Sequence, residues 1–226
     1  MDIPVTILGG YLGAGKTTLI NHVLSHALDV RVAVLVNDFG AVNIDASLIS
    51  SRAEDTITLS NGCVCCTIQD DLGAAIDAQL RRDKPPQHIL IEASGVAEPA
   101  RMLRYVESWP GLSRHAVVCV VDVETIRERA TDKFVGRVVR RQIGSADLLI
   151  LNKTDLVTAV ETRIGKINPT ATIRQSTRCD VPLDQVLNRG AFDLDRVLEI
   201  ELDFLDGEHD HEHDDQPARR RRRSEQ

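Results

Sequence analysis

A glycine-rich loop near the start of the chain, Gly9–Thr18, constrains the fold more than any other stretch. From Gly10 it fits the pattern Gly, four residues, Gly-Lys-Ser/Thr. An apolar run, Val5–Leu8, precedes the loop and a helical pattern, Thr18–Leu28, follows it, which is the context that the motif requires. Glycines allow backbone N–H groups to turn inward around an anion, and the helix N-terminus adds partial positive charge. The stretch therefore predicts a phosphate-binding loop rather than an ordinary glycine turn.

Two side chains of this loop have expected roles. Lys16 should reach the β and γ phosphates of a nucleoside triphosphate, and the Thr17 hydroxyl should ligate Mg²⁺. The other predicted nucleotide-binding residues of the loop are Gly10, Gly13, Ala14, Gly15 and Thr18.

Short apolar runs alternate with helical patterns along the rest of the chain. Continuous apolar runs flanked by polar or glycine-containing segments are typical of strands buried on both faces. We expect strands at Val5–Gly10, Val32–Val36, Asp55–Leu59, His88–Ile91, Ala116–Val121, Asp147–Leu151 and Ala171–Arg174. We expect helices at Thr17–Leu28, Gln69–Arg82, Glu98–Trp109, Thr125–Ile143, Leu156–Ile167 and Leu183–Asn188. The pattern predicts an α/β P-loop NTPase fold, a mostly parallel sheet of about seven strands with helices on both faces.

Composition and charge argue against several classes of protein. The formal net charge is −7, which does not favour nucleic-acid binding. No apolar run approaches the roughly 20 residues of a membrane helix, and the start of the sequence lacks the basic region of a secretory signal. We therefore expect a cytoplasmic protein without a membrane partner. In that compartment the five cysteines should be thiols or metal ligands rather than structural disulfides.

The composition changes from about residue 206. His209, His211 and His213 alternate with acidic residues, and an unbroken run of arginines follows at 219–223. Neither segment has a hydrophobic face to bury. We expect a nucleotide-binding domain over residues 1–205 and a disordered tail over residues 206–226. The histidines suit weak, exchangeable metal binding, or they belong to a merely solvated acidic tail.

A second motif, Asn152-Lys153-Thr154-Asp155, predicts which base the nucleotide carries. It directly follows a predicted strand. The Asp155 carboxylate can accept hydrogen bonds from N1–H and the 2-amino group of guanine, a pair that adenine lacks. A buried carboxylate left unpaired would penalise the wrong base. These four residues could also form a polar turn, but downstream of a phosphate loop Asn152, Lys153 and Asp155 predict GTP.

Acidic residues near strand ends are candidates for the chemistry of hydrolysis. Glu92 could hold the Mg²⁺ shell or orient the attacking water, or it could simply face solvent. Gly95 could donate its backbone N–H to the γ-phosphate. Asp38 and Asp45 are candidates for a loop that orders around the γ-phosphate. We predict Lys16, Glu92 and Asp38 as catalytic residues, with slow hydrolysis because no arginine finger or water-positioning glutamine is evident.

Three closely spaced cysteines, Cys63, Cys65 and Cys66, form a separate feature. As thiolates they would bind a borderline ion such as Zn²⁺, with a fourth ligand from elsewhere. A redox switch and inert buried cysteines are the alternatives, and the strain of a disulfide between adjacent Cys65 and Cys66 weakens the first. Cys119, inside a predicted strand, and Cys179, in a late loop, imply no chemistry.

The order of these motifs resembles the CobW-type family of metal-associated GTPases, relatives of the GTPases that help to mature urease and hydrogenase. The resemblance covers roughly residues 3–200. It rests on Gly9–Thr18, Asn37–Asp45, Ser60–Cys66, Glu92–Pro99 and Asn152–Asp155.

This resemblance implies a metallochaperone or metalloprotein activator. GTP would organise a zinc or cobalt site at the cysteines, and hydrolysis would release the ion to a client metalloprotein. Nucleotide-dependent homodimers are common among relatives. The alternatives are a nucleotide-gated metal buffer without a client and an ATP-using, kinase-like enzyme.

The sequence departs from the family pattern in three respects. Ala41 stands where the family often has Glu, and Ala93 stands where it usually has Ser or Thr. Family members often continue past a His-rich segment into another domain, so we expect most or all of that C-terminal domain to be lacking.

Overall fold

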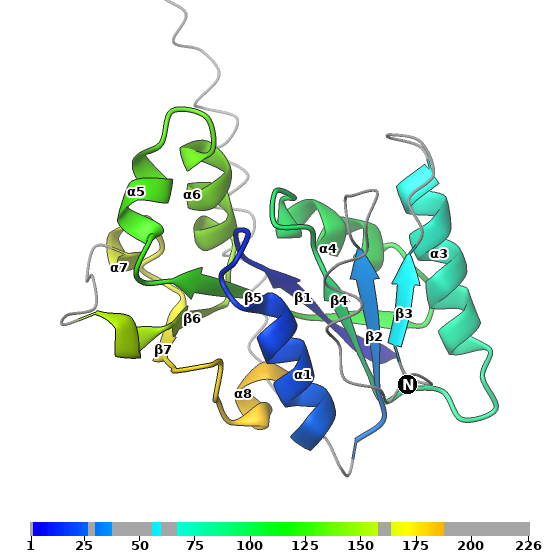
Figure 1. Ribbon diagram of the computed structural model, residues 1–226. Coiled ribbons are helices and arrows are strands. Elements are labelled where there is room, and N and C mark those ends of the chain that lie inside the picture. The colour runs from blue at the N-terminus through cyan, green and yellow to red at the C-terminus, as the bar shows by residue number, and fades with distance from the viewer. Residues whose placement is uncertain (1, 27–29, 38–55, 60–66, 158–163, 188–226) are drawn as a thin grey trace, which may run out of the picture. The chain divides into compact units, whose positions relative to one another are not determined.

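One parallel sheet organises the part of the chain that the structure describes (Figure 1). The structure is a computed structural model and describes residues 2–26, 30–37, 56–59, 67–157 and 164–187, all within one compact unit, residues 1–192. From one edge to the other, its strands are β3 (Thr56–Leu59), β2 (Val32–Asn37), β4 (His88–Glu92), β1 (Ile3–Gly9), β5 (Leu112–Asp122), β6 (Leu148–Asn152) and β7 (Thr172–Gln175). Every neighbouring pair is parallel. This architecture confirms the predicted fold class.

Helices cover both faces of the sheet (Figure 1). In the described residues they are α1 (Lys16–His26), α3 (Thr67–Leu80), α4 (Pro99–Glu107), α5 (Ile126–Thr131), α6 (Gly136–Gly144), α7 (Ile164–Ile167) and α8 (Leu183–Leu187), with a short 3-10 turn, η1 (Thr154–Leu156). None of these helices is long and apolar enough to cross a membrane.

The core consists of two apolar layers, one on each face of the sheet. Side chains of β6 show the division, because Leu148 and Ile150 pack with α1 and α8 whereas Leu149 and Leu151 pack with the helices of the opposite face. This alternation follows from the two-residue period of a strand. Both faces of β6 are fully buried, and its sequence is continuously apolar from Leu148 to Leu151.

The predicted helix Thr125–Ile143 is wrong as one element, because the structure has two helices there, α5 and α6. The Asp132 carboxylate accepts hydrogen bonds from the backbone N–H groups of Phe134, at 2.8 Å, and Val135, at 2.9 Å. These local bonds replace the helical ones and end the first helix. The apolar period continues across the break, which is why the sequence suggested a single helix.

Two other predicted elements differ from the structure by more than two residues. β5 begins at Leu112 rather than Ala116, because residues that include Arg114 and His115 form a polar, half-buried start that still pairs with β1. The predicted helix Leu156–Ile167 appears as η1 and α7 only, and residues 158–163 lie outside the described part. The predicted tail, residues 206–226, also lies outside it and stays a prediction.

Candidate nucleotide-binding site

The phosphate loop lies between β1 and α1. At two of its positions the backbone conformation and the neighbouring atoms leave room for glycine but not for a larger residue. Gly10 has a φ of 137°, and a Cβ there would collide with the carbonyl oxygen of Val120 on β5. Gly15 has a φ of 114°, and a Cβ there would lie 2.5 Å from Nδ2 of Asn152. Both conformations are unfavourable for other residues. The backbone of the loop is therefore held directly against β5 and the end of β6.

The structure brings the predicted residues Lys16 and Glu92 together. Lys16 Nζ lies 3.9 Å from Glu92 Oε1, and both side chains are buried. Glu92 occupies the last position of β4, opposite Leu8 of β1 and Val36 of β2. The position of β4 between these strands thus places a carboxylate beside the ammonium group of the phosphate loop.

The first turn of α1 offers further groups to a ligand. Thr17 is half-buried and Thr18 is exposed, both beside Lys16 at the helix N-terminus. A Thr17 hydroxyl and a Glu92 carboxylate are hard oxygen donors of the kind that Mg²⁺ prefers. These residues therefore fit a magnesium ion that accompanies a triphosphate.

The segment after β4 packs closely on the phosphate loop. The backbone N–H of Ala93 donates to the Leu8 carbonyl over 2.8 Å. A Cβ at Gly95 would lie 3.0 Å from the backbone nitrogen of Leu12 and 2.6 Å from its Cδ2. Gly95 is thus adjacent to the loop that would hold phosphates, as its predicted role requires.

Gln142 on α6 fixes this segment, a role that the sequence alone did not predict. Its Nε2 donates to the carbonyl oxygens of Gly95, at 3.1 Å, and Ala97, at 2.8 Å, and the side chain is buried. The neighbouring Arg141 donates to Glu98 Oε1 over 2.7 Å. The sequence does offer one indication of this role: Gln142 lies on the buried face of an amphipathic helix, where its amide must find hydrogen-bond partners.

Asn152 connects the phosphate loop to a third segment. Its Nδ2 donates to the Ala14 carbonyl over 2.9 Å, and its Oδ1 accepts from the backbone N–H of Cys179, at 2.9 Å, and from Ser176 Oγ, at 3.3 Å. The side chain is buried. Asn152 was predicted to bind the nucleotide, and the structure places its amide between protein groups. Its contribution to binding would therefore be indirect, through positioning.

The loop Ser176–Cys179 is a second part of the site that the sequence analysis missed. Arg178 and Cys179 have positive φ values of 54° and 56°, and Cys179 Sγ lies 3.3 Å from the Gly15 carbonyl. Burial raises the pKa of the Cys179 thiol, and likewise that of Cys119, to about 12. Both thiols are therefore protonated packing groups at neutral pH. No local sequence signal marks this loop.

Lys153 and Asp155 follow Asn152 at the same edge of the sheet. Lys153 has a φ of 65°, and its Nζ contacts Asp122 Oδ2, at the end of β5, at 2.6 Å. Asp155 is exposed in η1. The carboxylate is therefore available to a ligand, and the penalty for an unmatched base arises only when the bound base covers it.

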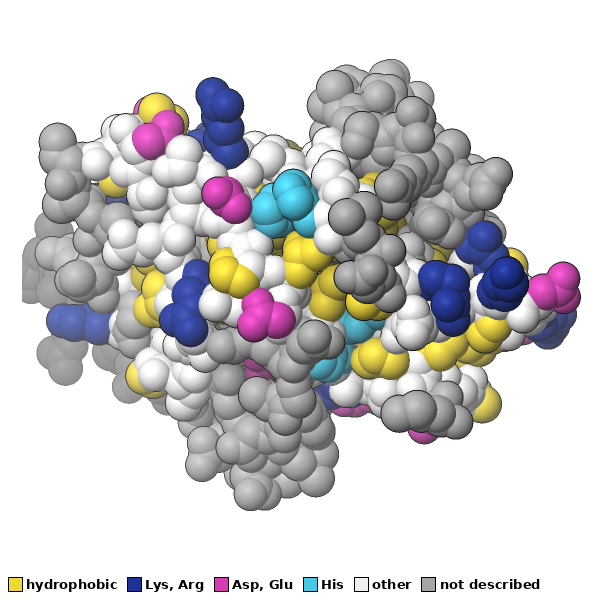
Figure 2. Space-filling view, turned by 90° about the horizontal axis from the view of Figure 1, so that it is seen from below, with side chains coloured by type: hydrophobic (Ala, Val, Ile, Leu, Met, Phe, Trp, Pro, Cys, Tyr) yellow, Lys and Arg dark blue, Asp and Glu magenta, His cyan; other side chains and the backbone are white. Residues whose placement is uncertain are grey.

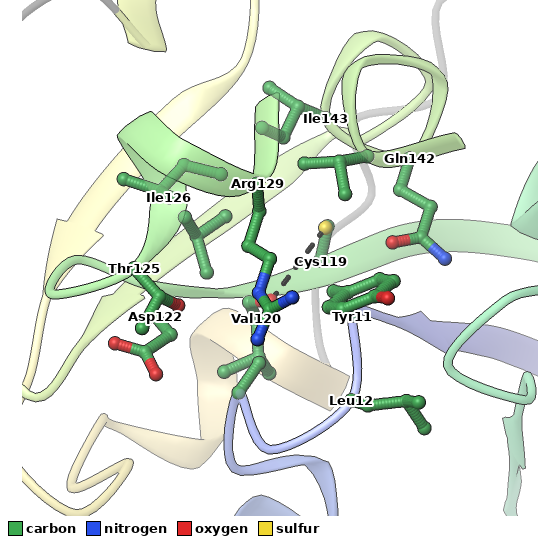
Figure 3. A pocket seen from close by; sticks show the side chains of 13 residues that line it. Tyr11, Leu12, Cys119, Val120, Asp122, Thr125, Ile126, Arg129, Gln142 and Ile143 are labelled. Atoms are coloured by element: carbon green, nitrogen blue, oxygen red, sulfur yellow. Dashed lines mark hydrogen bonds between the residues drawn. The ribbon is translucent and has the colours of Figure 1, made fainter. Parts of the chain in front are cut away.

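A pocket lies next to the phosphate loop, between it and α5 and α6 (Figure 3). Its lining includes Tyr11 from the loop, Asp122 from β5 and Gln142 from α6. Figure 3 shows Arg129 extending from α5 toward Tyr11, and its guanidinium carbon lies 5.4 Å from the centre of that ring. The structure therefore places a permanent positive charge beside the phosphate loop, which the sequence analysis did not single out.

Several predicted residues lie outside the described part of the chain. They are Asp38, Asp45, Cys63, Cys65 and Cys66. Among the described residues, no group of three or more His, Cys, Asp or Glu side chains could hold a metal ion. The predicted cysteine site therefore stays a prediction.

Comparison with known proteins decides the family. The family model of the CobW/HypB/UreG nucleotide-binding domain matches residues 4–175. The chain belongs to this family. The match covers the strands of the described sheet from Pro4 onward and both predicted nucleotide motifs, and it ends before the loop Ser176–Cys179.

Named relatives within the family are similar over most of this chain. The zinc-regulated GTPase metalloprotein activator 1 of Dictyostelium discoideum is 32% identical over an alignment of 240 positions, and the match covers 87% of this chain and 50% of that protein. The zinc chaperone YjiA of Escherichia coli (strain K12) is 34% identical over 204 residues, which cover 85% and 63%. The crystal structure of zinc-bound YjiA GTPase from E. coli has a TM-score of 0.64 and 29% identity, and the match covers 85% of this chain and 63% of that one. The chain thus spans about half to two thirds of the length of these relatives.

Proposed function

We propose that this chain is a GTP-hydrolysing metallochaperone or metalloprotein activator. The observation that carries the proposal is the buried pair of Lys16 and Glu92, 3.9 Å apart beside a phosphate loop, in a chain of the CobW/HypB/UreG family. The names of the two relatives, a zinc-regulated activator and a zinc chaperone, support the metal part of it. The protein would act in the cytoplasm.

Hydrolysis would depend on the residues around the phosphate loop. The Lys16 ammonium would balance charge on the β and γ phosphates and would then turn away from Glu92. Glu92 could then orient the attacking water, while Gly95 would donate its backbone N–H to the γ-phosphate. A Mg²⁺ ion bound at Thr17 would supply further charge neutralisation. We expect slow turnover from the isolated chain.

Guanine selection would depend on Asp155, with support from the loop that Asn152 holds. Asp155 is exposed at the end of the sheet where Asn152 joins the phosphate loop to Ser176–Cys179. A base seated there would cover the carboxylate and leave it unpaired unless the base offers two donors. This requirement favours GTP over ATP.

The cargo would be a transition metal, zinc in the first place and cobalt as the alternative, bound by Cys63, Cys65 and Cys66. Thiolates suit such ions. GTP binding would tighten the site and hydrolysis would release the ion to a client metalloprotein, with a nucleotide-dependent homodimer as the assembly. A metal buffer that is gated by nucleotide but has no client is the second candidate.

A metal titration with and without nucleotide tests the cargo proposal. Zinc affinity should be higher with a non-hydrolysable GTP analogue than with GDP. Linkage then requires that zinc raise the affinity for the GTP analogue, relative to that for GDP, by the same factor. A variant with Cys63, Cys65 and Cys66 changed to Ser should lose both effects. Equal zinc affinity in the two nucleotide states would contradict gated release, and gating without transfer to any metal-free acceptor would favour the buffer.

A separate substitution tests the catalytic assignment. Lys16→Ala should abolish GTP hydrolysis, because the phosphates lose their buried cation. The exposed Lys84→Ala is the matched control and should hydrolyse GTP at the rate of the unsubstituted chain. Unchanged turnover in Lys16→Ala would remove the phosphate-loop assignment.

A further inference from the structure

Two histidines at the C-terminal end of α1 lie side by side. His22 and His26 are four residues apart, so their side chains project from the same face of the helix. Their ring centres are 4.5 Å apart, with ring planes tilted by 36°. His22 is half-buried and His26 is exposed. Figure 2 shows histidine side chains grouped at the surface of the molecule on the side seen from below.

Hydrogen bonds fix which nitrogen of each ring carries the proton. His22 Nε2 lies 2.8 Å from the Val181 carbonyl oxygen, and His26 Nδ1 lies 2.8 Å from the His22 carbonyl oxygen. A carbonyl oxygen can only accept, so both of these nitrogens donate. In the neutral rings, Nδ1 of His22 and Nε2 of His26 therefore hold the lone pairs.

This hydrogen bonding is characteristic of histidines that bind metals. A ligating histidine usually donates its other ring N–H to a backbone carbonyl or a carboxylate, which fixes the tautomer and orients the ring. Both His22 and His26 meet that condition. A helix cap explains the bond from His26 to the His22 carbonyl, but it does not explain why the ring of His22 is fixed in the same way and lies beside that of His26.

We propose that His22 and His26 form a second transition-metal site that is independent of the cysteines. Two neutral imidazoles suit a borderline divalent ion such as Zn²⁺, Ni²⁺ or Cu²⁺. No third His, Cys, Asp or Glu joins them among the described residues, and water can occupy the remaining positions of the coordination sphere. The exposure of His26 leaves room for that water. The site is thus open and exchangeable, and it lies on the helix whose first residue is Lys16.

Another pair of histidines, His88 and His115, does not meet these conditions. Their rings are also close, 5.1 Å apart and perpendicular. His88 is buried inside the sheet and its Nε2 is hydrogen-bonded to Thr6 Oγ1 at 2.8 Å. Unlike His26, His88 is not exposed to the water that would complete the coordination sphere of an ion. This pair serves as the internal reference in the test.

The test uses the full chain with Cys63, Cys65 and Cys66 changed to Ser, without nucleotide, and Ni²⁺ as the probe. Ring-proton signals of the histidines are followed by NMR at substoichiometric Ni²⁺, which broadens the signals of its ligands. His22 and His26 should broaden together with one midpoint, while His88 and His115 remain sharp. Because neither the cysteines nor GTP takes part, failure of this result leaves the proposed function untouched.

Single substitutions then distinguish a chelate from two separate imidazoles. In His26→Gln, the Ni²⁺ concentration at which the His22 signal is half broadened should rise at least about tenfold. Loss of a residue that only supports a ligand already lowers metal affinity by about that factor. In His22→Asn, the midpoint of His26 should rise likewise. Ni²⁺ should also raise the melting temperature of the parent but of neither variant, a difference that loss of a helix cap alone does not produce. Unchanged midpoints in the variants, or broadening confined to His209, His211 and His213, would overturn the proposal.

Discussion

The side-chain amide of Asn152 donates a hydrogen bond to the carbonyl oxygen of Ala14 over 2.9 Å, across 138 residues of sequence. The same side chain accepts from the backbone of Cys179. One buried residue thus connects the phosphate loop, the end of β6 and the segment after β7. The hydrogen bonds of Asn152 therefore connect the expected binding sites for phosphate and base.

Replacing Asn152 should weaken nucleotide binding without removing any group that touches the nucleotide. Asn152→Ala leaves the Ala14 carbonyl and the Cys179 N–H without their partner, at about 1–3 kcal/mol for each buried polar group. We expect GTP and GDP affinity to fall at least about tenfold, measured by equilibrium binding of a fluorescent nucleotide.

Asn168 offers a matched control for that experiment. It is buried to the same extent, 3% exposed, and donates to the carbonyls of Ile143, at 2.7 Å, and Ala146, at 2.9 Å. Asn168→Ala should lower the free energy of unfolding by a similar amount while nucleotide affinity stays unchanged. Equal losses of affinity in the two variants would show that general destabilisation is responsible.

Gln142→Met should slow hydrolysis more than it weakens binding. The substitution keeps the size of the side chain but removes the donor to the carbonyls of Gly95 and Ala97. Because Gly95 is expected to meet only the γ-phosphate, GDP affinity should be unaffected and kcat should fall about tenfold or more. Gln79→Met, a buried glutamine on α3, is the control and should keep its kcat. A wild-type kcat in Gln142→Met would mean that this segment is positioned by other contacts.

Asp155→Asn should change the preferred base. An amide can donate where the carboxylate only accepts, so the variant should lose affinity for GTP by about 10- to 100-fold and gain affinity for xanthosine triphosphate. Competition among GTP, ATP and xanthosine triphosphate for a labelled nucleotide measures the change. If GTP binding survives intact, or if ATP displaces GTP at equal concentration from the unsubstituted chain, Asp155 does not read the base.

Two glycines of the phosphate loop should differ in their tolerance of a methyl group. Gly13 and Gly15 both have positive φ values, 77° and 114°. A Cβ at Gly13 meets nothing within 4 Å, whereas one at Gly15 lies 2.5 Å from Asn152 Nδ2 and 3.1 Å from Cys179 Sγ. Urea unfolding of the nucleotide-free protein should show a loss of about 1–2 kcal/mol for Gly13→Ala and a larger loss for Gly15→Ala. Similar losses would contradict the close packing at Gly15.

Acid should destabilise the protein through His88. Burial, and secondly the nearby His115, lower the pKa of His88 from 6.5 to about 3. Between these values the unfolded chain takes up a proton that the folded chain does not, so the free energy of unfolding falls as pH decreases, by up to about 1.4 kcal/mol per pH unit. Above pH 6.5 the His88 ring is neutral in both the folded and the unfolded chain, so the stability lost in acid is fully present there.

Urea unfolding at pH 7.5 and 5.5 measures the effect of His88. His88→Gln keeps a polar side chain beside Thr6 but cannot take up the proton, so its stability should depend less on pH over this interval. Asn168→Ala removes a buried polar side chain that does not titrate, and it should retain the pH dependence of the unsubstituted chain. If His88→Gln also retains it, other groups are responsible for the acid sensitivity.

The sequence was sufficient for most features that depend on neighbouring residues, with one local exception. Short apolar runs at regular intervals predicted the parallel sheet, because a strand buried on both faces must be apolar throughout. The phosphate loop and Glu92 were identifiable because the carboxyl ends of parallel strands meet at one edge. The long helix at Thr125–Ile143 was predicted incorrectly because Asp132 stops it without interrupting the apolar period.

Only the tertiary structure decided which side chains hold the site in place. Gln142, 47 residues from Gly95, and Cys179, 164 residues from Gly15, are brought to the phosphate loop by the packing of α6 and the crossover to β7. Their roles depend on long-range hydrogen bonds, which leave no periodic pattern in the sequence. The local sequence therefore determined the chemistry that the strand ends present, and the fold determined the geometry in which those groups meet.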